Sequence, residues 1–344
     1  MSAPDRTADA ADASPPGTGD AVPPGATSPA GAAPLARWWA RRAVSAVVVV
    51  WGAATLAFVG LHLLPGDPAR LIAGGGSLNG TSPQVLRLID RQYDFDRPLY
   101  AQYGHFLGQL VHGRLGTSYQ LGRPVTKVIA DQLGATLAVA GGAAVLGFAL
   151  ALLLALGTAG RPRARAVASA VELVLVSTPG FWIGVLLLSV FSFRLHLFPV
   201  LGNDGPRSLV LPWVTMALPI GGALSLVMRE GLERALDQPF AFTALTRGVG
   251  PGRLRLRHAL RHALLPVLTL SGWMLGQLLG GVVVVETVFA RSGIGQVTLS
   301  AVNGRDFPVV TGVVVLAAIT YVVISTAVDL LARLVDPRLR AVPR

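Results

Sequence analysis

A glutamate inside a long apolar run is the strongest candidate for chemistry in this sequence. Glu286 follows the residues GGVVVV, and Arg291 is the nearest opposite charge along the chain. A charged side chain inside a membrane is costly and tends to face a pathway. We therefore interpret Glu286 as a candidate pathway or gate residue.

The other ionisable residues in the apolar runs have structural interpretations. Asp329 precedes Arg333 by four residues, a spacing that pairs side chains on one face of a helix. Glu172 lies near the inner end of its apolar run, where its side chain can extend to the membrane surface or pair with the cluster at Arg163 and Arg165. We interpret the remaining one, a histidine at position 62 near the end of the first apolar run, as a packing residue.

The sequence lacks the motifs of common enzymes. It has no cysteine, which excludes disulfides, thiolate metal sites and thiol chemistry. The only lysine, Lys127, stands in GRPVTKV, which lacks the Gly-Lys-Ser/Thr ending of a phosphate-binding loop. Neither His-Glu-x-x-His nor Gly-x-Ser-x-Gly occurs. We therefore predict no catalytic residue, no metal site and no cofactor, and we predict that the chain is not an enzyme.

A basic, glycine-punctuated segment lies between two apolar stretches. Residues 246–266 read TRGVGPGRLRLRHALRHALLP and contain five arginines, two histidines and no acid. The formal net charge of the chain, +11, is typical of nucleic-acid-binding proteins or of cytoplasmic loops in membrane proteins. Because the arginines cluster between apolar runs, we favour the membrane interpretation and predict no nucleic-acid partner.

The composition indicates an all-α polytopic membrane protein. Of the 344 residues, 52% are hydrophobic and 14% are charged, whereas about a quarter of a soluble domain is charged. Several apolar runs reach the length of about 20 residues that spans a bilayer. We predict six transmembrane helices, at 43–64, 133–159, 166–193, 209–228, 263–290 and 308–333.

The positions of the arginines predict the orientation of these helices. With the N-terminus inside, most arginines fall in inner segments, and the two short outer loops carry only Arg194, Arg207, Arg291 and Arg305. Cytoplasmic loops are the ones that accumulate Arg and Lys. Both termini and the basic segment 246–266 are therefore predicted to be cytoplasmic.

The chain divides into five predicted regions, whose composition and periodicity differ. The N-terminal tail is rich in Ala, Pro and Gly and should be disordered in the cytoplasm. The long loop after the first span has apolar residues at helical spacing, which indicates a small helical external subdomain. The boundaries are 1–34 for the tail, 35–64 for an interfacial anchor and the first helix, 65–132 for the external subdomain, 133–335 for a five-helix core with a cytoplasmic loop at 229–263, and 336–344 for a cytoplasmic C-terminal tail.

An ordered series of short motifs resembles a known family. In chain order they are HLLPGDPAR, DFDRPLYAQY, GRLGTSY, GRPV, STPGFWIGVLL, RLHLFPVLG, TALTRGVGPGRLRLRHALRHALLPVLT, VVVVETVFARSGIGQ, RDFPVVTG and DPRLR. Over residues 38–341 the series resembles the inner-membrane permease subunit of binding-protein-dependent ABC importers. It is most similar to the first permease of dipeptide, oligopeptide and nickel systems.

The resemblance implies a bacterial inner-membrane subunit that works with partners. These would be a second homologous permease, two ATP-binding subunits and an extracytoplasmic substrate-binding protein, all acting at the lipid bilayer. ATP hydrolysis would belong to the ATP-binding subunits, and the cargo would be peptides or nickel. The residues alone leave open a gradient-driven secondary transporter of small solutes, which would favour charged midplane residues and internal repeats.

The resemblance also implies a role for the basic segment, as the loop that couples the permease to the ATPase. It places a short coupling helix at 240–247, a turn after it, and a proline at the start of the fifth span. The residues implied for ATPase coupling are Phe240, Thr243, Ala244, Arg247, Gly248 and Pro266.

Overall fold

The structure is a computed structural model that describes residues 33–63, 68–73, 82–93, 95–200, 202–203 and 205–335. The predicted C-terminal tail and almost all of the predicted N-terminal tail lie outside the described residues. The chain divides into two compact units, residues 1–41 and residues 42–344. In the described part of the first unit, the rings of Trp38 and Trp39 meet edge to face with centroids 4.7 Å apart.

Long apolar helices dominate the described residues. Five of them are long and apolar enough to cross a membrane, and a sixth span is possible if two shorter helices are counted together. The five lie in α1 (Ala33–His62), α5 (Val125–Thr158), α8 (Arg207–Leu236), α11 (Leu260–Val288) with the turns before it, and α13 (Phe307–Val335). The described chain is thus all-α, and its spans correspond to five of the six predicted ones.

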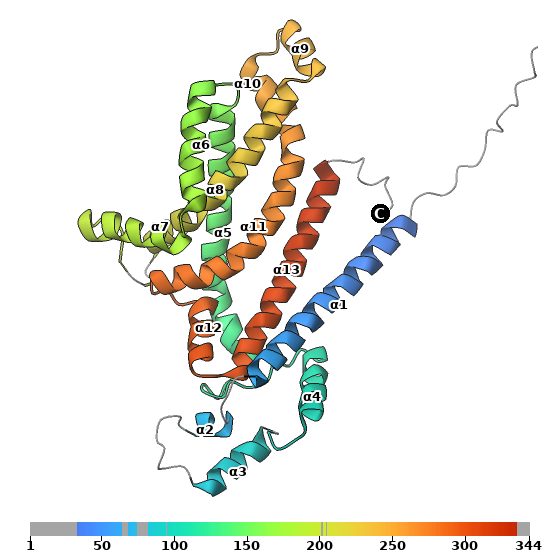
Figure 1. Ribbon diagram of the computed structural model, residues 1–344, viewed down its shortest axis with the longest axis vertical. Coiled ribbons are helices and arrows are strands. Elements are labelled where there is room, and N and C mark those ends of the chain that lie inside the picture. Colours follow the sequence, from blue (N-terminus) through green and yellow to red (C-terminus); the bar gives the residue numbers. More distant parts are fainter. Residues whose placement is uncertain are drawn as a thin grey trace, which may run out of the picture. The chain divides into compact units, whose positions relative to one another are not determined.

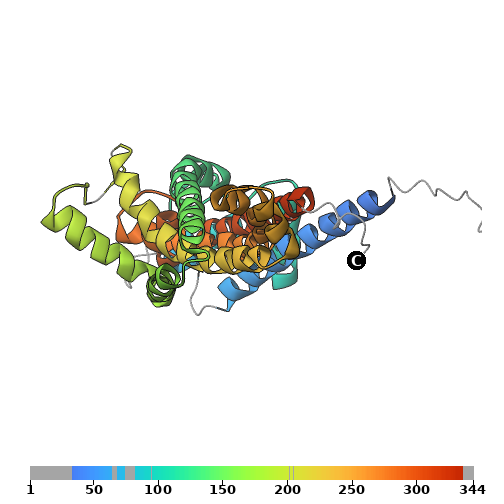
Figure 2. The same cartoon turned by 90° about the horizontal axis from the view of Figure 1, so that it is seen from above.

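The predicted third span, 166–193, is broken in the structure. It consists of α6 (Pro162–Ser177) and α7 (Gly180–Leu187), with a π-helical turn at Leu188–Arg194 after α7. The two parts meet at an angle of 103°, and both views show α7 extending sideways from α6 (Figures 1 and 2). Proline disfavours helical backbone angles in the residue before it. Thr178, which precedes Pro179, accordingly has extended angles and ends α6.

The region predicted as an external subdomain contains three short helices. They are α2 (Pro68–Ile72), α3 (Pro83–Gln92) and α4 (Leu99–Val111). α3 begins with a capped turn, because Ser82 Oγ accepts a hydrogen bond from the amide of Gln84. α5 begins at Val125, eight residues before the predicted second span.

α8 lies in the middle of the core, between several other helices. It packs against α5, α6, α7 and α11. Small residues bring the helices close, as where Gly231 of α8 meets Ala263 of α11. Buried Ala155 of α5 and Leu232 of α8 belong to the core cluster at this crossing.

The fifth span begins earlier than predicted. α10 (Pro251–Arg253), a π-helical turn at Leu254–Ala259 and α11 run on as one apolar segment from Pro251 to Val288. Pro266, which was expected to open the span, therefore lies inside α11. A proline is tolerated there because neighbouring helices and local adjustments satisfy the backbone groups that it frees.

Candidate functional site

The candidate functional residues lie at two opposite ends of the helices. α9 (Pro239–Thr246) and α10 lie at one end, where α5 ends, α6 begins and α8 ends (Figure 1). α12 (Ile294–Asn303) lies at the other end, after α11 and before α13 (Figure 1). We call these the α9 end and the α12 end.

α9 is joined to α8 by only two residues. Asp237 caps the end of α8, and Gln238 precedes α9 with extended backbone angles. Pro239 occupies the first helical position, where its missing N–H costs nothing. A connection this short makes α9 follow the position of the α8 terminus.

The two faces of α9 differ. On the inner face Ala241 is buried, and the ring of Phe240 lies 5.2 Å from that of His262 between centroids. On the outer face Phe242 is 73% exposed and Leu245 is 47% exposed. These two residues are three apart, so they lie on one side of the helix and form an apolar surface at the α9 end.

A left-handed glycine ends α9. Gly248 has φ +82°, and its amide donates to the carbonyl of Leu245 at 3.0 Å. The amide of Val249 donates to the carbonyl of Ala244 at 3.1 Å, which closes the end of the helix. No atom lies within 4 Å of the position that a Gly248 Cβ would occupy. The backbone angle, and not crowding, therefore requires glycine.

At the α12 end, Glu286 is completely buried and fully partnered. Its Oε1 accepts a hydrogen bond from Thr136 Oγ1 at 2.7 Å, and its Oε2 accepts one from the amide of Gly295 at 2.7 Å. Thr136 Oγ1 also accepts from the amide of Ile294 at 2.8 Å. The carboxylate and the hydroxyl thereby fix the first turn of α12 against α5. A gate or pathway role for Glu286 stays a prediction.

Two glycines leave room for this carboxylate. A Cβ at Gly293 would lie 2.1 Å from Glu286 Oε1, and a Cβ at Gly295 would lie 2.5 Å from Val283 Cα.

Arg291 follows α11 and donates from Nη1 to Ser208 Oγ at 2.8 Å. Burial lowers the pKa of the Arg291 guanidinium, and the charge of Glu286 opposes that shift.

A second buried carboxylate joins the segment before α5 to the start of α13. Asp306 accepts hydrogen bonds from Ser118 Oγ and from the amide of Tyr119, the latter at 3.1 Å. Gln120 Nε2 donates to the carbonyl of Gly304 at 2.8 Å. Burial, and after it the charge of Asp306, raises the pKa of the Tyr119 hydroxyl. The motifs GRLGTSY and RDFP thus contact each other directly.

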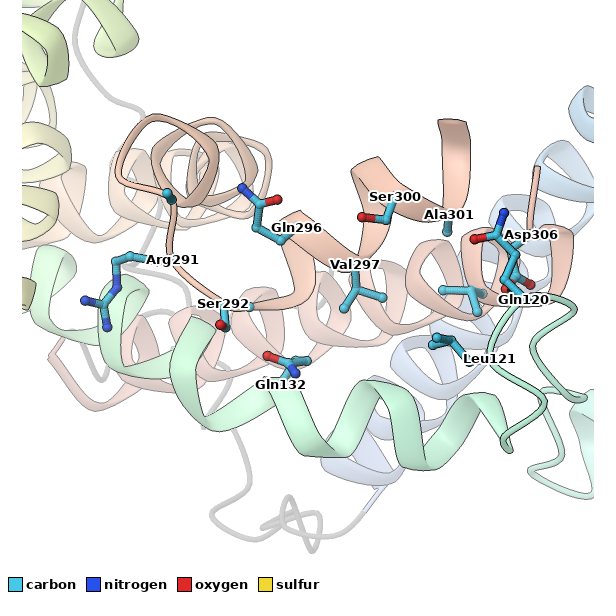
Figure 3. Close-up of a pocket in the computed structure, with 13 residues that line it drawn as sticks. Gln120, Leu121, Gln132, Arg291, Ser292, Gln296, Val297, Ser300, Ala301 and Asp306 are labelled. Atoms are coloured by element: carbon cyan, nitrogen blue, oxygen red, sulfur yellow. The ribbon is translucent and has the colours of Figure 1, made fainter. Parts of the chain in front are cut away.

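A pocket of about 450 Å³, with both polar and apolar side chains in its walls, lies between these two carboxylate contacts. Figure 3 shows Gln132 of α5 and Val297 of α12 pointing toward the space between the two helices. Three glutamine amides and two serine hydroxyls line it, and such groups both donate and accept hydrogen bonds. Those residues are Gln120, Gln132, Ser292, Gln296 and Ser300.

The structure separates the residues that the sequence singled out. The predicted coupling residues other than Pro266 lie in or directly after α9, whereas Glu286 lies at the opposite end.

Asp329 forms an ion pair with Arg42 of α1 at 2.8 Å. Glu172 pairs with Arg229 of α8 and not with the predicted cluster at 163–165. The first residue of the predicted cytoplasmic loop 229–263, Arg229, therefore belongs to α8. It can lie buried in that helix because it is paired with Glu172.

Sequence reasoning did not single out Phe242 and Leu245. A signal was present, since two large apolar residues three apart stand in a segment bounded by arginine. Within the described residues, no group of three or more His, Asp or Glu side chains is arranged to hold a metal ion.

Comparison with family models gives two matches that together span most of the chain. Residues 143–341 match the model described as "Binding-protein-dependent transport system inner membrane component". Residues 35–140 match the N-terminal model described as "Binding-prot-dependent transport system membrane comp, N-term".

Known proteins of similar length resemble most of the chain. A Brucella abortus protein named "Putative peptide transport system permease protein" is 35% identical over 310 residues, which cover 87% of this chain and 98% of that protein. The "Glutathione transport system permease protein GsiC" of Escherichia coli is 33% identical over 304 residues, covering 87% and 97%. In a solved structure of the inward-facing MetNI methionine ABC transporter, one chain has the same fold, with a TM-score of 0.50 at 22% identity, over 61% of this chain and 97% of that one.

Proposed function

Because this chain belongs to the family of binding-protein-dependent transport system inner membrane components, as an inner-membrane ABC importer permease of the peptide type, we propose that it forms half of a path for peptides. The other half would come from a second, homologous permease. An external binding protein would deliver the peptide, and two ATP-binding subunits would drive transport. Family membership excludes the gradient-driven secondary transporter.

The surface on α9 is the observation that carries this proposal. Phe242 and Leu245 are exposed at the end of the helices, on a helix that follows α8 after two residues. Exposed apolar residues on a short helix beyond the end of the spans favour an interaction surface. We assign that surface to the ATP-binding subunit, which places the α9 end in the cytoplasm. The arginines of segment 246–266 support the same orientation.

Peptide as the cargo is supported by the relatives and by the pocket at the α12 end. Both curated relatives carry names of peptide or glutathione transport permeases. The amides of Gln132 and Gln296, which line the pocket, can donate to carbonyls and accept from N–H groups of a peptide backbone. Nickel, the other predicted cargo, would favour carboxylate, imidazole or thiolate ligands, which the pocket does not present as a cluster.

Copurification tests the assignment of α9. A tagged permease carrying Phe242→Ser and Leu245→Ser should reach the membrane in normal amounts, because both side chains are exposed. It should retain little ATP-binding subunit and import little labelled peptide. Leu256→Ser is the matched control, since Leu256 is also an exposed apolar residue near this end but lies outside α9. Normal ATPase copurification by the α9 variant would contradict the proposed docking surface.

A further inference from the structure

A buried ion pair joins α6 and α8 near the α9 end. Arg229 of α8 donates from Nη1 and Nη2 to the two oxygens of Glu172, at 3.0 Å and 2.5 Å. The two side chains are 4% and 1% exposed. This is the two-pronged geometry in which a planar guanidinium fixes both the distance and the rotation of its partner.

The same guanidinium also reaches a third helix. Arg229 Nη1 donates to Thr158 Oγ1 of α5 at 3.1 Å, and Nη2 donates to Ser169 Oγ of α6 at 2.9 Å. Ser225 Oγ of α8 donates to Glu172 Oε1 at 2.5 Å. One arginine therefore contacts side chains from α5 and α6 while it stands on α8. Arg229 and Glu172 each form hydrogen bonds beyond the ion pair itself.

Stability is a poor explanation for such a pair. Removing two charges from water is costly, and well-packed apolar residues in place of a buried ion pair are often as stable or more stable. Ionisable residues inside membrane helices mark functional positions more often than packing positions. What an apolar replacement cannot supply is the fixed register between the helices.

The position of the pair along α8 indicates what that register serves. Arg229 lies seven residues before the end of α8 at Leu236, or about 10 Å at 1.5 Å per residue. α9 follows after two further residues. A displacement of α9 therefore enters the membrane through the stretch of α8 that holds Arg229.

We propose that Glu172 and Arg229 are positioning residues that join α5, α6 and α8 into one rigid unit, so that movement of α9 displaces all three helices together. This inference rests on the proposed function, because it takes α9 as the ATPase-docking helix. Without the pair, α8 would slide against α6, and ATP hydrolysis would continue with little transport. Neither residue needs to contact the cargo.

The test replaces the pair and leaves the packing in place. In Glu172→Met/Arg229→Met, side chains of similar length fill the site without charge. The matched control is Arg165→Met/Glu233→Met, which removes the exposed ion pair between the same two helices, at 2.9 Å. Because the chain has no cysteine, Arg163→Cys and Asp237→Cys can carry the only spin labels of this subunit, one on α6 and one at the end of α8.

Three measurements are made on the assembled importer: ATPase copurification, the distance between the labels with and without a non-hydrolysable ATP analogue, and uptake of radiolabelled trialanine per ATP hydrolysed. For the native pair and the control, we expect one label distance that the analogue leaves unchanged. For the Met/Met variant we expect normal copurification, a broadened or shifted distance, and uptake per ATP lower by about ten-fold.

Each other result has a defined meaning. A Met/Met variant with native label distance and native uptake per ATP would overturn the positioning role. Failure of that variant to accumulate or to bind the ATPase would make the pair a folding requirement, and would overturn the inference as well. Failure of the unaltered permease to retain any ATPase would instead contradict the proposed function itself.

Discussion

At the scale of single residues, the turn after α9 depends on the one left-handed glycine there. We expect Gly248→Val to weaken ATPase copurification and uptake at normal membrane abundance. A β-branched residue held at the φ of +82° is destabilised by on the order of 1–2 kcal/mol. The turn should relax to other backbone angles, and α9 should move with it. Gly250→Val is the control, because Gly250 has φ −64° and open space around it. Equal loss in both variants would mean that side-chain bulk, and not backbone angle, disturbs the loop.

The contact between Glu286 and Thr136 allows a second prediction at this scale. Glu286→Gln and Thr136→Val should each destabilise the assembled permease by about 1–3 kcal/mol, because a buried donor or acceptor loses its partner. In Glu286→Gln an NH₂ group replaces one of the two carboxylate oxygens. That NH₂ group cannot accept the hydrogen bond from Thr136 or from the backbone amide of Gly295, whichever it faces. Thermal unfolding of the purified complex measures the effect.

Thr136→Ser keeps the hydroxyl and should restore most of the stability. If both Glu286→Gln and Thr136→Val unfold at the native temperature, the carboxylate does not hold α12. If Glu286→Gln alters uptake without altering unfolding, the residue acts in the pathway, as the sequence predicted.

At the scale of elements, the crossing of α8 and α11 has room for no side chain. A Cβ at Gly231 would lie 2.9 Å from Ala263 Cα. Gly231→Ala should therefore push the helices apart at the α9 end, with a cost of about 1–3 kcal/mol from overpacking. We expect lower thermal stability and less ATPase bound per permease. Gly280→Ala on α11 meets nothing within 4 Å and should be neutral. A neutral Gly231→Ala would show that the helices separate here without cost.

At the scale of the whole molecule, the arginine distribution predicts the orientation. A green fluorescent reporter fused after Arg165 or inserted at Gly252 should be fluorescent in the cytoplasm, because both positions lie at the α9 end. The same reporter at Asn203, beside the contact of Arg291 with Gly202, should face outward and stay dark. Fluorescence at Asn203 would contradict both the six-span topology and a cytoplasmic α9.

The sequence by itself determined the membrane class and the positions of most spans. These depend on properties that can be read locally along the chain. A bilayer requires about 20 apolar residues in a row, and arginines stay on the cytoplasmic side. The turn after residue 247 was implied by the resemblance to a known family, and the structure has a left-handed glycine at that position, Gly248.

Only the tertiary structure decided which charges and faces meet. Glu172 finds Arg229 across 57 residues, and Glu286 finds Thr136 across 150. No spacing rule could select these partners. A buried carboxylate can be satisfied by any suitable donor, and helix packing decides which donor is near. The bend at Pro179 and the exposure of Phe242 and Leu245 have the same origin. A proline indicates that a helix ends, but the direction of the next helix and the side that remains uncovered depend on what packs against it.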